Sequence, residues 1–154
     1  LNVTDMSEMF YGATSFNQDI GSWDVGKVTD MKVMFAEASS FNQDIDKWDV
    51  SSVTDMSGMF ASATSFNQDL KNWNVGNVID MRLMFSDALS FNGDIRMWDV
   101  SNVTIMQFMF SGAISFNQDL RNWNVDNVIS CGTFWSGSSL SEVLIPIFTK
   151  CNPD

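Results

Sequence analysis

A 25-residue repeat constrains the fold of this chain more than any other feature. One tryptophan column, two methionine columns and two phenylalanine columns recur at that interval, each with five members. Five full units extend from residue 16 to residue 140, after a partial unit at residues 1–15, and no unit contains an insertion. A fixed period of about 20–50 residues is typical of solenoids and propellers, and a propeller blade or a two-helix repeat needs a longer unit than this one. The sequence therefore predicts a solenoid of stacked coils.

Each unit carries one pattern typical of a strand and one typical of a helix. Trp23-Asp24-Val25 alternates apolar, polar and apolar residues, as a half-buried strand does. Val28, Met31, Met34 and Ala38 recur at intervals of three and four residues, as the buried stripe of a short helix does. The predicted fold class is an α/β repeat, with one short parallel strand plus one short helix in each 25-residue coil.

The apolar frame of the unit resembles that of a known repeat family. The spacing Ile20-x-x-Trp23-x-Val25-x-x-Val28-x-x-Met31-x-x-Met34-Phe35 is similar to the LxxLxL frame of leucine-rich repeats, with aromatic and sulfur-containing residues in place of leucine. Over roughly residues 1–135 the chain resembles the BspA-like leucine-rich repeat surface proteins, in their 25-residue FNQDIxxWDVxxVxxMxxMF variant. The resemblance implies a leucine-rich-repeat-like right-handed solenoid and a secreted or cell-surface location. It implies little about activity, because the family is largely defined by its repeat.

The repeat decays near the C-terminus, which predicts a solenoid over residues 1–128 and a C-terminal cap over residues 129–154. The segment 140–148 is apolar and no longer periodic, as expected of a segment that covers the core edge of a last coil. Cys131 and Cys151 are the only cysteines. We predict that they form a disulfide that pins the cap, worth about 3 kcal/mol, and the alternative is two free buried thiols. A disulfide would indicate an oxidising compartment.

The tryptophan column is expected to form part of the core. Polar residues flank each tryptophan and a valine follows two positions later, which favours a buried indole over a cofactor groove or a sugar-stacking platform. The predicted core tryptophans are Trp23, Trp48, Trp73, Trp98 and Trp123.

Two polar columns are equally regular. The asparagine column is expected to form a ladder that pairs with turn backbone between coils; its members are Asn17, Asn42, Asn67, Asn92 and Asn117. Stacked carboxylates repel unless they accept backbone N–H bonds or share a bridging cation such as Ca²⁺. The candidate calcium column consists of Asp19, Asp44, Asp69, Asp94 and Asp119, and capping by backbone amides is the alternative.

Composition and motifs exclude several classes of function. Eight basic and 19 acidic residues give a formal net charge of −11, which argues against nucleic acid as a partner. The chain contains no histidine, so histidine triads and histidine zinc sites are excluded. No apolar run is long enough to span a membrane. No phosphate-binding loop, serine elbow or isolated pair of carboxylates stands out, so we expect neither catalytic residues nor a cofactor.

Recognition is expected at the columns that change from unit to unit, since constant columns build the scaffold. Beside the tryptophan column, on the predicted strand face, two such columns form a polar row. Its candidate partner-binding residues are Lys47, Asp49, Asn72, Asn74, Met97, Asp99, Asn122 and Asn124. An ordinary solvated face is the alternative. On the predicted helical side, Leu83 and Phe108 stand on adjacent coils as a candidate small contact patch.

The sequence thus predicts a non-enzymatic extracellular or cell-surface module for adhesion or recognition, which presents a polar strand face to a protein or a glycan. The alternative is a structural protein that assembles by stacking end to end through uncapped coils, with calcium between its aspartate columns. A glycan-processing enzyme is a third hypothesis, although an unbroken repeat is unusual for an enzyme.

Overall fold

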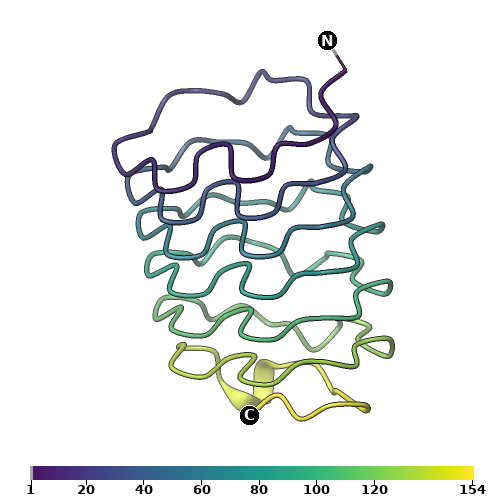
Figure 1. Cartoon of the computed structure of the whole chain (residues 1–154). Coiled ribbons are helices and arrows are strands. Elements are labelled where there is room, and N and C mark those ends of the chain that lie inside the picture. The colour runs from purple at the N-terminus through teal and green to yellow at the C-terminus, as the bar shows by residue number, and fades with distance from the viewer. Residues whose placement is uncertain (1) are drawn as a thin grey trace.

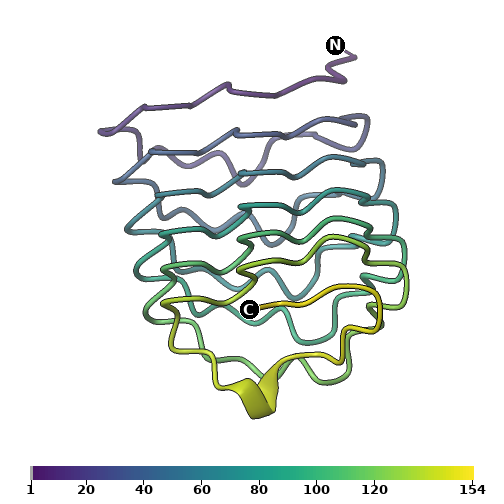
Figure 2. The ribbon, with the colours of Figure 1, turned by 60° about the horizontal axis from the view of Figure 1, so that its bottom comes forward.

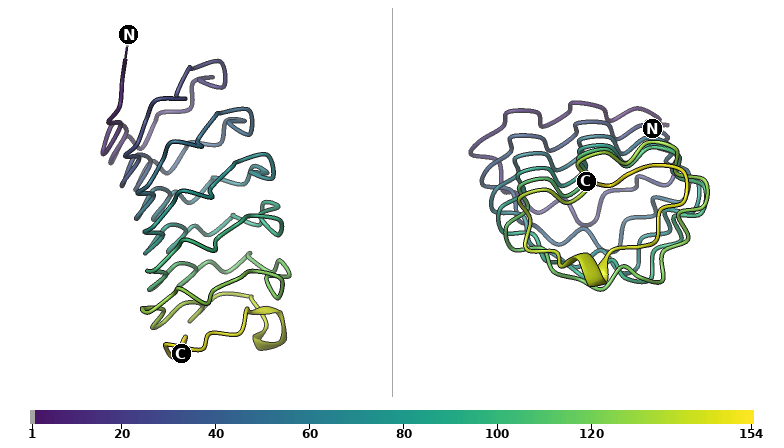
Figure 3. Two further views of the ribbon diagram at one scale, coloured as in Figure 1. Left: turned by 90° about the vertical axis from the view of Figure 1, so that its right-hand side faces the viewer. Right: turned by 90° about the horizontal axis from the view of Figure 1, so that it is seen from below.

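The computed structural model describes residues 2–154 and shows a column of stacked coils (Figure 1). Each coil spans one unit of the sequence repeat, because isolated parallel β-bridges join positions one period apart. The bridges are Asp5–Asp30, Asp30–Asp55, Asp55–Asp80, Asp80–Ile105 and Ile105–Ser130. Figure 3 shows the stack from the side and, from below, the rings that the coils form around the core.

The segment of each coil that faces the viewer in Figure 1 is a run of tight turns, illustrated by residues 31–38. The N–H groups of Met34 and Ala38 donate to carbonyls three residues earlier in the same coil, over 3.2 and 3.1 Å. Those of Val33 and Phe35 donate to carbonyls of the next coil, both over 2.8 Å. Donors that alternate in this way tie each coil to its neighbour.

The predicted fold class, a leucine-rich-repeat-like α/β solenoid with a strand and a helix in each coil, is wrong. Residues 2–154 contain no α-helix and no strand longer than a single bridging residue, and the one helical element among them is η1, a 3-10 helix at Glu142–Leu144. Residues 28–38 do not form the expected helix, because an α-helix pairs its N–H groups within the segment and here alternate N–H groups bond to another coil. Residues 23–25 lie between two turns rather than in a strand.

Two columns in the run of turns have a left-handed backbone, with φ between +54° and +73°. They occupy the third residue of a turn, where type II turns require positive φ and glycine fits best. The first column contains Glu8, Val33, Gly58, Leu83, Phe108 and Thr133, and the second contains Gly12, Glu37, Ser62, Asp87, Gly112 and Gly137. Glycine fills one of the six positions in the first column, so the sequence gives little sign of these turns.

Stacked aromatic rings form much of the core. Phe35, Phe60 and Phe85 lie one above another, with successive centroids 5.6 Å apart and ring planes within 9° of parallel. The indole N–H of Trp73 donates to the carbonyl of Ile45 in the preceding coil over 2.9 Å. Equivalent bonds hold Trp48, Trp98 and Trp123. Each coil therefore satisfies the buried polar groups of the one beside it.

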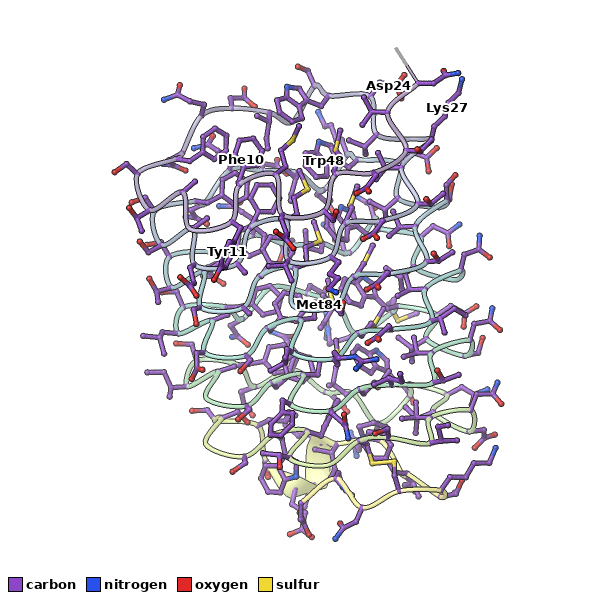
Figure 4. The ribbon with its side chains drawn as sticks, viewed as in Figure 1. Phe10, Tyr11, Asp24, Lys27, Trp48 and Met84 are labelled. Atoms are coloured by element: carbon purple, nitrogen blue, oxygen red, sulfur yellow. A yellow bond between two sulfur atoms is a disulfide. The ribbon has the colours of Figure 1, made fainter. Side chains whose placement is uncertain are left out.

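Four of the five predicted core tryptophans lie in the core, and the first does not. Trp48, Trp73, Trp98 and Trp123 are 3–4% exposed, whereas Trp23 is 37% exposed. The prediction therefore fails for Trp23, since residues 2–154 place no coil on its N-terminal side. Figure 4 shows Phe10, Trp48 and Met84 among the side chains inside the stack, while Asp24 and Lys27 stand at its margin.

The segment predicted as a cap forms a last, modified coil. Ile145 and Phe148 stand one period after Leu120 and Trp123 and pack partly against the core. η1 lies at the end of the stack opposite the N-terminus (Figure 2). The N–H of Leu120 donates to the carbonyl of Leu144 over 2.9 Å, which ties this coil to the one above.

Two contacts close the C-terminal end. Cys131 and Cys151 form the predicted disulfide, with their Cα atoms 5.8 Å apart. The chain then turns back under the last coil, where the N–H of Phe134 donates to the carbonyl of Pro153 over 2.8 Å. Residues 151–154 therefore occupy part of the place that a further coil would take.

Candidate functional site

The predicted polar row lies on the segment that runs behind the core in Figure 1, and we call it the back row. It consists of Lys47, Asp49, Asn72, Asn74, Met97, Asp99, Asn122 and Asn124, and all eight are exposed. Because residues 23–25 and their equivalents form no strand, the row stands on the turns that flank each tryptophan.

Half of the back row caps turns. The Oδ1 atoms of Asn74, Asp99 and Asn124 each accept the N–H two residues later, over 3.1 Å. The Oδ1 atom of Asp49 accepts the N–H of Ser51 over 3.1 Å and its hydroxyl over 2.6 Å. These bonds, the hydroxyl first, hold the pKa of Asp49 below its ordinary value. This column thus has a structural role in addition to its exposure.

The other half of the back row changes from coil to coil. The column contains Lys47, Asn72, Met97 and Asn122. Met97 is 83% exposed, as much as any apolar side chain described. The amide of Asn72 donates to Asp46 Oδ2 over 2.5 Å, which fixes its orientation. The column carries an ammonium, an amide, a thioether and an amide in turn, so neighbouring coils always differ in chemistry on a constant backbone.

The carboxylates of the aspartate column accept hydrogen bonds from their own coil or from the next one. Asp19 accepts the N–H of Gly21 over 2.9 Å, and Asp69 accepts the N–H of Asp94 over 2.9 Å. Asp119 pairs with Arg121, Nη2 to Oδ2, over 2.7 Å. Hydrogen bonds from Arg121 are the main reason that the pKa of Asp119 falls from 3.8 to about 2.

These bonds agree with the alternative prediction for the aspartate column, in which backbone amides cap the carboxylates. Asp44 and Asp94 likewise accept the N–H two residues later, over 3.0 and 3.2 Å. Within residues 2–154, no three acidic or cysteine side chains converge in a way that could hold a metal ion. The stacked carboxylates are therefore accommodated by amides and arginines of the chain itself.

The asparagine ladder forms as predicted. Asn42 donates its backbone N–H to Asn17 Oδ1 over 2.9 Å, and the next three coils repeat the bond over 2.9–3.0 Å. Gln43 adds a side-chain bond to the same oxygen over 2.9 Å. Because the side-chain oxygens of Asn17, Asn42, Asn67 and Asn92 are used within the stack, this column belongs to the scaffold rather than to a binding site.

Two hollows lie at opposite ends of the stack. One of about 330 Å³ is lined by Asp19, Gly21, Ser22, Asp44 and Lys47. It adjoins the first residue of the back row, Lys47. The other, of about 300 Å³, is lined by Trp135, Ser136, Gly137 and Asp154 in the last coil. Both are open to solvent rather than enclosed.

Comparison with known proteins gives one match. A family model described as "Mycoplasma protein of unknown function, DUF285" matches residues 1–92 and again residues 68–144. The two overlapping matches are consistent with an internal repeat. No curated protein and no solved structure matches the chain. Within residues 2–154, we find no helix with the length and apolar character needed to cross a membrane.

Proposed function

Since the chain belongs to the DUF285 family, whose function is unknown, we propose that it is a non-enzymatic interaction module that binds a protein or a glycan through its back row. Within this broad repeat family, the resemblance to BspA-like leucine-rich repeat surface proteins supports the finer proposal of an adhesion or recognition role.

The observation that carries the proposal is the contrast between constant and variable columns. A tryptophan stands at the same position in five coils and is buried in four of them, whereas the outward neighbour beside it changes from Lys47 to Asn72, Met97 and Asn122. A purely structural stack has no need of a chemistry that changes from each coil to the next. Repeat proteins that bind partners vary their exposed columns on a constant scaffold in this way.

The chemistry of the back row suits a polar partner. Amide groups donate and accept hydrogen bonds, Lys47 adds a positive charge, and Met97 offers an adaptable apolar contact. Such a surface fits a protein loop or an uncharged glycan better than a polyanion, because the chain carries a net charge of −11.

A secreted or cell-surface location is part of the proposal. The disulfide between Cys131 and Cys151 supports it, because disulfides persist in oxidising compartments. We do not extend the proposal to end-to-end stacking, because residues 151–154 occupy part of the C-terminal edge that a further coil would need.

The proposal is tested by probing a glycan array and a protein array with the folded chain. We expect at least one ligand whose binding falls about tenfold or more in the double variant Lys47→Ala/Met97→Ala. The control is Lys32→Ala, an exposed lysine in the run of turns on the other side of the stack. If the double variant binds every ligand found as strongly as the wild type does, the back row is not the binding site.

A further inference from the structure

The surface formed by the run of turns, which we call the front, loses its charge along the stack. In the first three coils it carries one lysine and five acidic residues, which are Asp5, Glu8, Asp30, Lys32, Glu37 and Asp55. The fourth coil carries Asp80, Arg82 and Asp87, with Arg82 paired to Asp80. Residues 100–118 and 127–141, which include the front of the last two coils, contain no charged residue. A chain of net charge −11 therefore has one neutral region on this side.

Apolar side chains replace polar ones in the same part of the front. Six of them are between 40% and 64% exposed, and we call them the apolar front surface: Ile79, Leu83, Leu89, Phe108, Ile114 and Ile129. The equivalent columns of the first three coils hold Thr4, Thr29 and Thr54, then Glu8, Val33 and Gly58, then Thr14, Ser39 and Thr64. In these three columns the change begins at the fourth coil, which still carries Asp80, Arg82 and Asp87, and it continues into the two coils whose front has no charge. Exposed apolar patches of this kind often mark contact surfaces.

The backbone conformation of two of these residues gives no stability advantage to a large side chain. Leu83 and Phe108 both have φ of +58°, a left-handed conformation that is unfavourable for residues with a side chain. Gly58, one coil earlier in the same column, provides the unstrained solution. Glu8, Val33 and Thr133 share this left-handed backbone, so Leu83 and Phe108 differ from them in being large, apolar and exposed on neighbouring coils.

We propose that the apolar front surface packs against the same surface of a second copy of this chain, around a two-fold axis. Such an isologous contact pairs each apolar side chain with an apolar surface. The two stacks run in opposite directions and overlap only at their last three coils. Their acidic first coils project away from each other, so the contact avoids placing rows of carboxylates face to face.

The distribution of charge favours this partner. Residues 1–77 carry 11 acidic and four basic side chains, whereas residues 78–154 carry eight and four. Two copies that meet anywhere along their first halves bring like charges together, which opposes association. The neutral front of the last coils is where two identical acidic chains can approach at little electrostatic cost. Since three coils present a modest area, we expect a dissociation constant on the order of 10 µM.

Sedimentation velocity of the folded chain tests the proposal, over about 1–500 µM and at about 0.15 and 0.5 M salt. We expect a monomer–dimer equilibrium that saturates at the dimer and strengthens with salt, because salt screens the residual repulsion. The variant Leu83→Asp/Phe108→Asp should remain monomeric throughout. The control Met97→Asp places one added aspartate on the back row and should dimerise within about threefold of wild type.

A second variant separates loss of the contact from loss of the fold. Leu83→Gly/Phe108→Gly removes the apolar side chains while relieving the left-handed strain, so it should fold and still fail to dimerise. A wild-type chain that stays monomeric at about 500 µM, association that continues beyond a dimer, or a dimer unaffected by either double variant would each overturn the proposal. Ligand binding at the back row is measured separately, so either proposal can fail alone.

Discussion

The disulfide between Cys131 and Cys151 is predicted to hold the last coil against the stack. It closes a loop over a sequence separation of 20, which restricts the unfolded chain by about 3 kcal/mol of entropy at 25 °C. Apart from the disulfide, the last coil contains one short helix, η1, and is held by backbone hydrogen bonds such as that from Phe134 to Pro153. Replacing both cysteines by serine should therefore release residues 131–154 before the coils above them unfold.

Native-state hydrogen exchange on the double variant Cys131→Ser/Cys151→Ser measures this effect coil by coil. A loss of about 3 kcal/mol corresponds to roughly 100-fold faster exchange of amides that depend on the last coil. The amides of Leu120 and Phe134 should lose protection, because each donates to a carbonyl in residues 142–154. The amide of Met56, which donates to Asp80 within the stack, should keep its protection.

Wild-type protein treated with a reductant is the matched control, because it breaks the same bond without a substitution. It should exchange as the double variant does. Unchanged protection of Phe134 in both samples would refute the proposed role of the disulfide. An equal loss at Phe134 and Met56 would refute the separate release of the last coil, since it would show that the whole stack unfolds as one unit.

Two further predictions concern single side chains. Trp73→Phe should lower the free energy of unfolding by about 1–3 kcal/mol in urea titrations, because it removes part of a buried ring together with the 2.9 Å indole bond to the carbonyl of Ile45, which then keeps only the N–H of Trp48. Trp23→Phe, at a site 37% exposed, should lower the free energy of unfolding by less than half as much, and equal losses would contradict this account. Because the folded pKa of Asp119 is depressed to about 2 from 3.8, its contribution to stability is present above about pH 4 and is lost as the pH falls through 2. An NMR titration of Arg121→Gln should show the Asp119 midpoint return toward 3.8, and a midpoint that stays near 2 would contradict the assignment to Arg121.

The sequence predicted the features that follow from the 25-residue period. It did not predict the backbone conformations and exposures that depend on a neighbouring coil. Trp73 and Asn42 recur once in every unit, and their buried and hydrogen-bonded roles follow from stacking alone. The disulfide followed from two cysteines in one terminal segment. The exposure of Trp23 depends on its place at the edge of the stack, which its local sequence does not distinguish from that of Trp48.

The incorrect helix shows why a local pattern was not enough. Apolar residues at intervals of three place Val28, Met31 and Met34 on one side of a helix, but the same spacing also places them on the inner side of consecutive turns. The choice between the two is decided by where the N–H groups find acceptors. Val33 donates to Ser57 of the next coil and adopts a left-handed backbone with φ of +57° to do so. That bond exists only in the stack, so one unit in isolation contains no information that favours the turns over the helix. The conformation of each coil is therefore a property of the repeat rather than of its own segment of sequence, and a single excised unit should not keep it.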